Sequence, residues 1–269
     1  MSTGIAGEMT RDKQLDRSSH RRMKTRDKLI LAAEKLFAEE GISAVSMRRI
    51  NSAANQKNVS ALHYYFGSRD AIIEAIFDYR MPRAARRRNE LIDEIVAANM
   101  QYNLRALVHA AIWPLAEQIL SEARPNNFIR FLSQSHRLAR MDSWMLVRHK
   151  NRQSLVRVYI MLIRAIDELP RAIVHSRLIM ALRHAIYVLA DLDNVIEKRH
   201  AELRDPMVKF HANELIDMIT TALRAPLSPQ TREAYENLMK HSGRTEATLF
   251  GPDTIQAVSR NTSLVDEIE

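Results

Sequence analysis

Side chains that can bind a nucleic acid gather in the first third of this sequence. Most are basic or carry a hydroxyl, amide or imidazole group, and one is a small apolar side chain. They are Arg22, Lys24, Ser46, Arg48, Lys57, Asn58, Val59, Ser60, His63, Tyr64 and Arg69. An arginine fork can bond O6 and N7 of guanine together, polar side chains bond phosphate oxygens, and valine methyl groups can touch a thymine methyl. These residue types therefore indicate a surface that contacts double-stranded DNA.

The positive charge of the chain is concentrated in the same region. Residues 1–88 hold 18 Lys and Arg against 10 Asp and Glu, whereas residues 89–269 hold 22 of each. The whole net charge of +8 thus belongs to the first third of the chain. Phosphate binding with release of counterions requires a local excess of this kind. The alternative is a basic tail and a solvated helix face that only happen to be N-terminal.

The sequence gives no sign of catalytic or metal-binding chemistry. It contains no Cys, HExxH, paired metal-ligand spacing, glycine-rich phosphate loop or nucleophile elbow. We therefore predict no catalytic residue, metal or cofactor, and an enzyme is disfavoured. The lack of cysteine fits a cytoplasmic location. The longest apolar run, residues 185–190, is far shorter than the roughly 20 residues of a membrane span, so no membrane partner is expected.

The elements that must position the basic side chains are short amphipathic helices within residues 25–79. Apolar residues at helical spacing predict a first helix that ends at Gly41 and a second that Ser46 caps. Asn55 suits a left-handed turn, since Asn tolerates that conformation better than most residues. Asn58 can then cap a third helix, and Ser68 a fourth. This layout is typical of a helix-turn-helix DNA reader.

The same residues resemble the N-terminal domain of the TetR-type transcriptional repressors. The matching segments are AAEKLFAEEG, SMRRI and ALHYYFGSRDAII, in that order, within residues 25–79. The sequence departs from the family in four places. Residues 54–58 replace the usual Ala-Gly-Val-Ser, the span from Ile50 to Phe66 is one residue longer, His63 replaces Tyr, and Arg69 replaces Lys.

The resemblance implies roles for several side chains. The recognition helix, about residues 59–65, would lie in the major groove with Val59 and Ser60 facing the bases. Arg48 lies where the family often places a basic side chain, so we expect it to read a base; a phosphate contact or a solvated position are the alternatives. His63 replaces a tyrosine that often contacts backbone or base. Arg69 is expected to bind phosphate beside the start of the fourth helix.

Composition predicts an all-α fold, because the chain is 46% apolar with 6 Gly and 8 Pro and no strand alternation. We expect an N-terminal three-helix helix-turn-helix DNA-binding domain and a larger helical ligand-binding and dimerisation domain. The expected divisions are a flexible basic tail (1–20), the DNA-binding domain (21–80), the effector-binding and dimerisation domain (81–241) and a flexible C-terminal tail (242–269).

Two helices of the second domain could enclose an effector. One spans Leu104–Leu120 and contains Pro114, which forces a kink; the other spans about Asp142–Glu168. A ligand site of mainly apolar character with a few polar groups is predicted there. Its candidate residues, each of which also suits ordinary core or surface, are Trp113, Phe131, Gln134, Arg148 and Tyr159.

The link between the two domains has its own signals. Pro82 interrupts the pattern of the fourth helix and is expected to bend it. The run Arg86-Arg87-Arg88 follows, and suits either a solvated helix face or an additional phosphate contact. In the family that the sequence resembles, this helix joins the DNA-binding domain to the core and moves when ligand binds.

Two further helices, Pro170–Lys198 and Pro206–Leu223, are predicted to form a homodimer face. The resemblance implies that they pair with their copies in a four-helix bundle, so that the dimer reads a near-palindromic operator. It also implies a repressor that a small effector releases from DNA. The apolar core favours a hydrophobic effector, possible classes being carboxylates and acyl-coenzyme A thioesters. The alternative is a constitutive DNA-binding regulator or activator with no small-molecule ligand.

Overall fold

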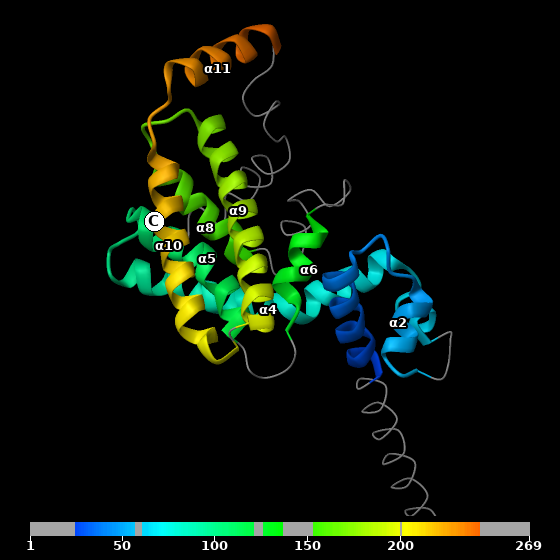
Figure 1. Ribbon diagram of the computed structural model, residues 1–269. Helices are drawn as coiled ribbons and strands as arrows, with labels where there is room; N and C mark the ends of the chain where they lie inside the picture. The colour runs from blue at the N-terminus through cyan, green and yellow to red at the C-terminus, as the bar shows by residue number, and fades with distance from the viewer. Residues whose placement is uncertain (1–24, 57–60, 121–125, 137–152, 200, 243–269) are drawn as a thin grey trace, which may run out of the picture. The chain divides into compact units, whose positions relative to one another are not determined.

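The computed structural model describes residues 25–56, 61–120, 126–136, 153–199 and 201–242, which are helical with no strand among them (Figure 1). The predicted all-α class is confirmed. The first helix covers residues 25–40. It is followed by α2 (Met47–Ala53), α3 (Ala61–Phe66), α4 (Arg69–Ala97), α5 (Leu104–Leu120), α6 (Phe128–Ser135), α8 (Gln153–Arg164), α9 (Arg171–Arg199), the 3-10 helix η1 (Ala201–Leu203), α10 (Arg204–Arg224) and α11 (Pro229–Ser242).

The chain forms two compact units, Met1–Tyr79 and Arg80–Glu269. The helix α4 begins in the first unit and ends in the second. Several predicted residues lie outside the described part of the chain. These are Arg22, Lys24, Lys57, Asn58, Val59, Ser60 and Arg148, together with both predicted tails except residue 242.

The N-terminal unit has two of the three predicted caps, Ser46 and Ser68, and both predicted turns, while the third cap, Asn58, lies outside the described residues. Gly41 follows the first helix with φ 86°, and Asn55 follows α2 with φ 53°, so both adopt the left-handed conformation. The Ser46 hydroxyl accepts a hydrogen bond from the backbone N–H of Arg49 at 3.2 Å, and the Ser68 hydroxyl accepts one from Ala71 at 3.1 Å. These hydroxyls take up backbone donors that a helix start leaves free.

The fourth helix does not end at Pro82. α4 is a single helix of 29 residues that contains Pro82. A proline removes one backbone hydrogen bond, but the neighbouring Met81 and Ala84 side chains are buried. Tertiary packing therefore keeps the helix continuous where local preference would have broken it.

The expected end of the long helix at Glu168 is wrong, since α8 ends at Arg164. Two arginine side chains bind the backbone just there. Arg171 donates to the carbonyl of Ile163, and Arg224 donates to the carbonyl of Ala165 at 3.5 Å. Basic side chains are favourable partners for the carbonyl groups that a helix end leaves free.

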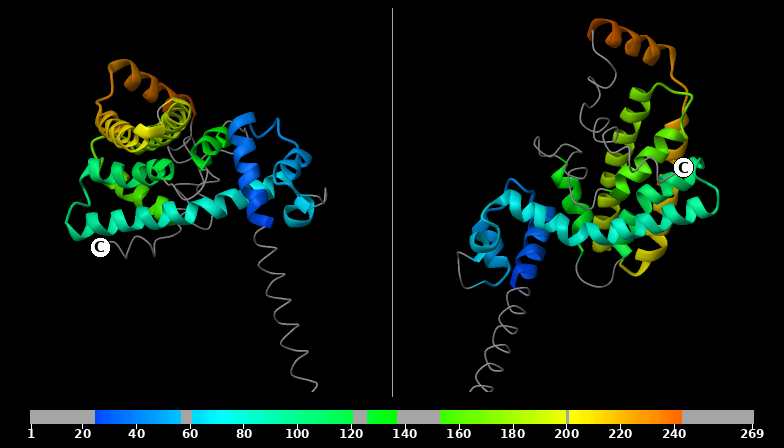
Figure 2. Two further views of the ribbon diagram at one scale, coloured as in Figure 1. Left: turned by 60° about the horizontal axis from the view of Figure 1, so that its bottom comes forward. Right: turned by 180° about the vertical axis from the view of Figure 1, so that it is seen from behind.

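The C-terminal unit is a cluster of helices in which α5 is central. α5 has the predicted bounds and is in contact with α6, α8, α9 and α10 (Figures 1 and 2). Its buried side chains cover most of the helix surface, and the remaining side has the part-exposed His109, Trp113 and Glu117. Residues 171–198 of α9 are long and apolar enough to cross a membrane by length and composition. In this unit α9 packs against α5, α6, α8 and α10.

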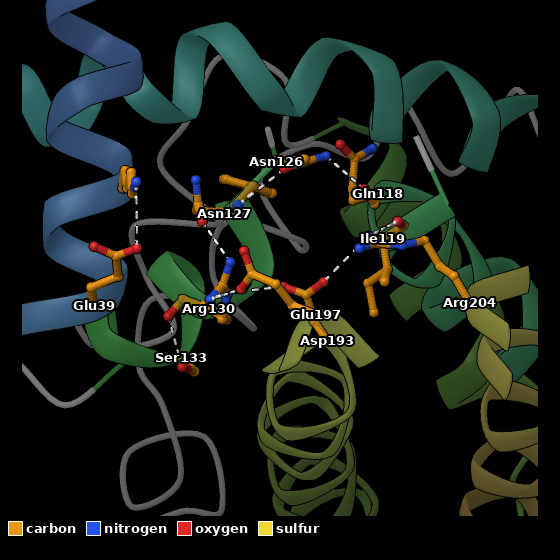
Figure 3. Close-up of polar contacts among 12 residues, drawn as sticks. Glu39, Gln118, Ile119, Asn126, Asn127, Arg130, Ser133, Asp193, Glu197 and Arg204 are labelled. Carbon is orange, nitrogen blue, oxygen red and sulfur yellow. Dashed lines mark hydrogen bonds and ion pairs between the residues drawn. The ribbon is translucent and has the colours of Figure 1, made fainter. Parts of the chain in front are cut away.

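A network of charged side chains joins α6 to the C-terminal helices (Figure 3). Nε of Arg130 lies 2.9 Å from Oδ2 of Asp193, and Nη1 of Arg130 lies 2.6 Å from Oε2 of Glu197. Nε of Arg130 and Oδ2 of Asp193 form an ion pair, but their geometry is not that of a hydrogen bond. Arg204 lies 3.9 Å from Asp193 and donates to the carbonyl of Ile119 at 3.2 Å. The network thus connects α6, α9, α10 and the end of α5.

Candidate nucleic-acid interface

The relative placement of α2 and α3 depends on a buried amide. Asn51 of α2 is 4% exposed, and its Oδ1 accepts the backbone N–H of Leu62 at 3.1 Å. Leu62 is itself fully buried. Because this N–H belongs to the first turn of α3, it has no partner within that helix. Asn51 therefore acts as a cap supplied by the preceding helix, a role that the sequence analysis missed.

A hollow of about 430 Å³ lies where α2, α3 and the start of α4 meet. It brings together three of the predicted DNA-binding residues, Arg48, His63 and Arg69. The complete lining is Met47, Arg48, Asn51, Leu62, His63, Gly67, Ser68 and Arg69. Basic and hydrogen-bonding groups from three helices thus converge on one surface of the unit.

Two adjacent arginines at the start of α2 differ in their surroundings. Arg49 is paired, since its Nη2 lies 2.9 Å from Oε1 of Glu40 and its Nε donates to the same oxygen at 3.3 Å. The hydrogen bond and the charge of Glu40 both raise the pKa of Arg49. Arg48 is exposed and has no hydrogen bond or ion pair within the described residues. Of the two, Arg48 is the guanidinium that is available to an incoming base or phosphate.

Arg69 is only partly available. It is half-buried, and its Nη2 donates to the carbonyl of Val45 at 2.7 Å, just before α2 begins. The side chain thus ties the start of α4 to the start of α2, and its remaining N–H groups could still bind phosphate. Ser46 likewise uses its hydroxyl as a helix cap. Both residues therefore have structural roles beside the DNA contact predicted for them.

The side chains of α3 divide into exposed and packed groups. His63 and Tyr64 are exposed, Tyr64 at 66%. Tyr65 is half-buried, and its ring meets that of Tyr64 edge-on at 5.3 Å. The Arg26 guanidinium lies over the ring of Phe66 at 5.3 Å and so connects the first helix to α3.

The short helices, the left-handed turn at Asn55 and the converging basic groups define a helix-turn-helix DNA-binding domain. Residues 29–76 match the model of the bacterial regulatory proteins of the tetR family. The match identifies an N-terminal helix-turn-helix DNA-binding domain of the tetR-family type and supports a DNA-binding transcriptional regulator. A search of curated proteins found no match to the chain.

The predicted effector residues lie in separate surroundings. The Trp113 indole donates to Oε1 of Glu117 at 2.7 Å and stacks on His109 at 5.2 Å. Phe131 is fully buried beside Phe128, and the Tyr159 hydroxyl is hydrogen-bonded to Nδ1 of His175. Gln134 is half-buried on α6. The polar groups of Trp113 and Tyr159 already have protein partners, which leaves them less free for a ligand.

The three arginines of residues 86–88 have different surroundings. For Arg88, both the predicted solvated helix face and the predicted phosphate contact are wrong. Arg86 is exposed, whereas Arg87 pairs with Glu117 at 3.1 Å and with Glu90 at 3.2 Å. Arg88 is fully buried. The sequence held a signal for this burial, because Arg88 continues the buried stripe of α4. That stripe contains Met81, Ala84, Leu91, Ile92 and Ile95.

Proposed function

We propose that this protein is a cytoplasmic homodimeric repressor that binds a near-palindromic operator and leaves it when a small effector binds. DNA recognition would use Arg48 and the exposed face of α3, with the predicted tail residues and Arg69 on phosphates. The observation that supports the dimer is a row of large apolar side chains left in solvent on α9 and α10.

The exposed apolar residues of α9 and α10 recur at helical spacing. On α9 they are Met180, Tyr187 and Val195; on α10 they are Phe210 and Met218. Intervals of seven or eight residues return to one side of a helix about every two turns. The two helices pack against each other (Figure 1). A paired apolar face of this kind favours burial against a second copy in a four-helix bundle.

A twofold dimer explains how a short recognition helix can select a site. Each copy would place one α3 in the major groove, and the two half-sites would be about 34 Å apart, one turn of DNA. The operator is then expected to have the symmetry of the protein.

The effector would bind in the C-terminal unit, where Pro114 interrupts the hydrogen bonding of α5 within an apolar core. The effector need bind the DNA-free conformation only modestly more tightly than the DNA-bound one. A difference of about 1.4 kcal/mol in binding free energy changes the ratio of the two conformations tenfold.

The adjacent arginines provide the test of DNA recognition. The operator would first be selected from random duplex DNA, then titrated with the full chain in a fluorescence anisotropy assay. Arg48→Ala should weaken binding by about 1–3 kcal/mol and relax the preference at one base pair. Arg49→Ala is the matched control, because its side chain is already paired with Glu40, and it should change sequence preference little.

Three outcomes would contradict the proposal. The first is equal binding by the wild type and the Arg48→Ala variant. The second is a selected DNA site without twofold symmetry. The third is operator binding that no small molecule reverses, which would favour the constitutive regulator instead.

A further inference from the structure

Arg88 is a buried guanidinium at the meeting point of three helices of the C-terminal unit. It belongs to α4, and its Nη1 donates to the Ser154 hydroxyl of α8 at 3.2 Å. Its Nη2 lies 3.4 Å from the carbonyl oxygen of Ala111 on α5. Both contacts are at or beyond the long end of the usual range for such bonds. The Nε atom has no hydrogen-bond partner.

The charge of Arg88 is not balanced by any carboxylate in the described part of the chain. Other arginines of this unit, such as Arg87, Arg130 and Arg157, each have an acidic partner, whereas the hydrogen-bond partners of Arg88, Ser154 and Ala111, are neutral. Burial lowers the pKa of Arg88 to about 10, so the group is still protonated at neutral pH. A buried charge without a counterion is costly, and proteins rarely keep one without a use for it.

The surroundings of Arg88 are apolar. The side chains one turn away on α4, Ala84, Leu91 and Ile92, are all buried. Ser154 is itself 2% exposed, and Val158, one turn further along α8, is buried as well. Ala111 lies within one turn of Pro114. The proline has no backbone N–H and so cannot donate a hydrogen bond within the helix. The site therefore combines one positive fork and one hydroxyl with a hydrocarbon environment.

We propose that Arg88 and Ser154 form the head-group site of the effector, and that the effector is an apolar molecule with a single carboxylate. This assignment rests on the effector response proposed above and specifies its chemistry. A guanidinium can bind a carboxylate with two parallel hydrogen bonds, using the Nε that now has no partner. Among the described residues Arg88 is the only arginine or lysine that is buried. One positive charge matches a monoanion better than a phosphate dianion or the several charges of a nucleotide-containing thioester.

The test compares three probes with the same ten-carbon chain on the full-length protein. These are decanoate and decyl phosphate, each below the concentration at which it forms micelles, and 1-decanol below its solubility limit. Binding is measured by isothermal titration calorimetry and by the shift of the thermal unfolding midpoint. The variants are Arg88→Met, which keeps an apolar stem and removes the charge, Ser154→Ala, and Arg86→Met as the control on an exposed neighbouring position.

We expect decanoate to bind the wild type more tightly than either other probe. Arg88→Met should weaken decanoate binding by about 10- to 100-fold and leave decanol binding unchanged. Without any probe, Arg88→Met should melt at a higher temperature than the wild type, because it removes an uncompensated buried charge. Ser154→Ala should weaken decanoate binding less than Arg88→Met does, and Arg86→Met should behave as the wild type.

A lower melting temperature for Arg88→Met without probe would overturn the inference, since it would identify Arg88 as a structural residue. So would equal decanoate binding by Arg88→Met and the wild type, no decanoate binding by the wild type, or a preference for decyl phosphate. Release from operator DNA distinguishes a failure of the Arg88 assignment from a failure of the proposed effector response. A compound that releases the wild type and Arg88→Met from DNA equally would preserve the effector response while removing Arg88 from it.

Discussion

Some polar side chains of the helix-turn-helix unit hold its helices together, while others are exposed and could contact DNA. Asn51 is buried and holds the N-terminus of α3, while Arg69 uses one of its N–H groups on the carbonyl of Val45. Arg48, one position from the paired Arg49, is left exposed without a partner in the described residues. The residue type alone could not separate these roles, because an arginine is equally able to bind phosphate, carboxylate or carbonyl.

At the residue scale, Asn51 is expected to contribute to both stability and DNA binding. Asn51→Ala would leave the backbone N–H of Leu62 buried without its acceptor, at a cost of about 1–3 kcal/mol. Urea denaturation of the full chain, followed by circular dichroism, measures the loss. Because α3 would lose its anchor, operator affinity should fall as well. Ser52→Ala, on the exposed neighbouring position, is the control and should change neither quantity; an equal effect of both substitutions would refute the role of Asn51.

At the scale of elements, the short-range features of the DNA-binding unit could be predicted from sequence. Gly41 and Asn55 have positive φ, and Ser46 and Ser68 cap helices as expected. Each of these preferences depends on a few neighbouring residues, so a short stretch of sequence contains the information. The hollow lined by Arg48, His63 and Arg69 brings together side chains of three adjacent helices that the sequence analysis had assigned to DNA binding.

Features that depend on distant residues could not be predicted in the same way. The continuity of α4 through Pro82 depends on packing of the side chains around it. The end of α8 is bound by Arg171 and Arg224, which follow in later helices. The buried position of Arg88 could be inferred from its spacing, but its partner Ser154 lies 66 residues further along the chain. Sequence periodicity shows which face of a helix is buried, and not what it is buried against.

The attachment of α6 to α9 leads to a second prediction. Asp193 is almost fully buried, and burial raises its pKa, although the charges of Arg130 and Arg204 oppose this shift. Asp193→Ala should leave Arg130 as a nearly buried charge without its closest partner, at a cost of about 3–5 kcal/mol. Glu197→Ala removes the other, half-exposed partner of Arg130 and should cost less than about 1 kcal/mol.

The free energy of unfolding of both variants, from urea titrations, decides between buried and surface pairing. Losses below about 1 kcal/mol for both Asp193→Ala and Glu197→Ala would show that Arg130 is solvated well enough to need neither partner. The same titrations on Asp193→Asn would report whether the shape of the side chain alone can hold α6 in place.

At the scale of the whole molecule, two partly buried histidines should make stability depend on pH. Burial lowers the pKa of His109 and of His136, and the charges of Arg105 and Arg183 respectively add to the effect. The unfolded chain therefore binds more protons than the folded one as the pH falls below about 6.5, so stability should decrease there. Chemical denaturation at about pH 7.5 and pH 5.5 measures the difference. The double variant His109→Gln, His136→Gln should show a smaller decrease, and an unchanged one would assign the pH dependence to other groups.

The proposed dimer can be tested through side chains that the isolated chain leaves in solvent. Met180 of α9 is 57% exposed and Phe210 of α10 is 64% exposed. Burying one such side chain contributes about 1.5–3 kcal/mol, and a twofold interface counts each substitution twice. Met180→Ser with Phe210→Ser should therefore weaken self-association by about a thousandfold or more, as measured by sedimentation equilibrium. Leu238→Ser, at an exposed position of α11 outside this face, is the control.

The same variants connect the dimer to DNA recognition. A monomer retains one intact α2–α3 unit, so binding to an isolated half-site should be similar for the double variant and the wild type. Binding to the complete palindrome should fall steeply, because the second half-site no longer binds as part of the same complex. If the double variant stayed dimeric, the α9–α10 face would not be the interface. If it became monomeric yet bound the palindrome as tightly as the wild type, dimerisation would not be the source of operator selection.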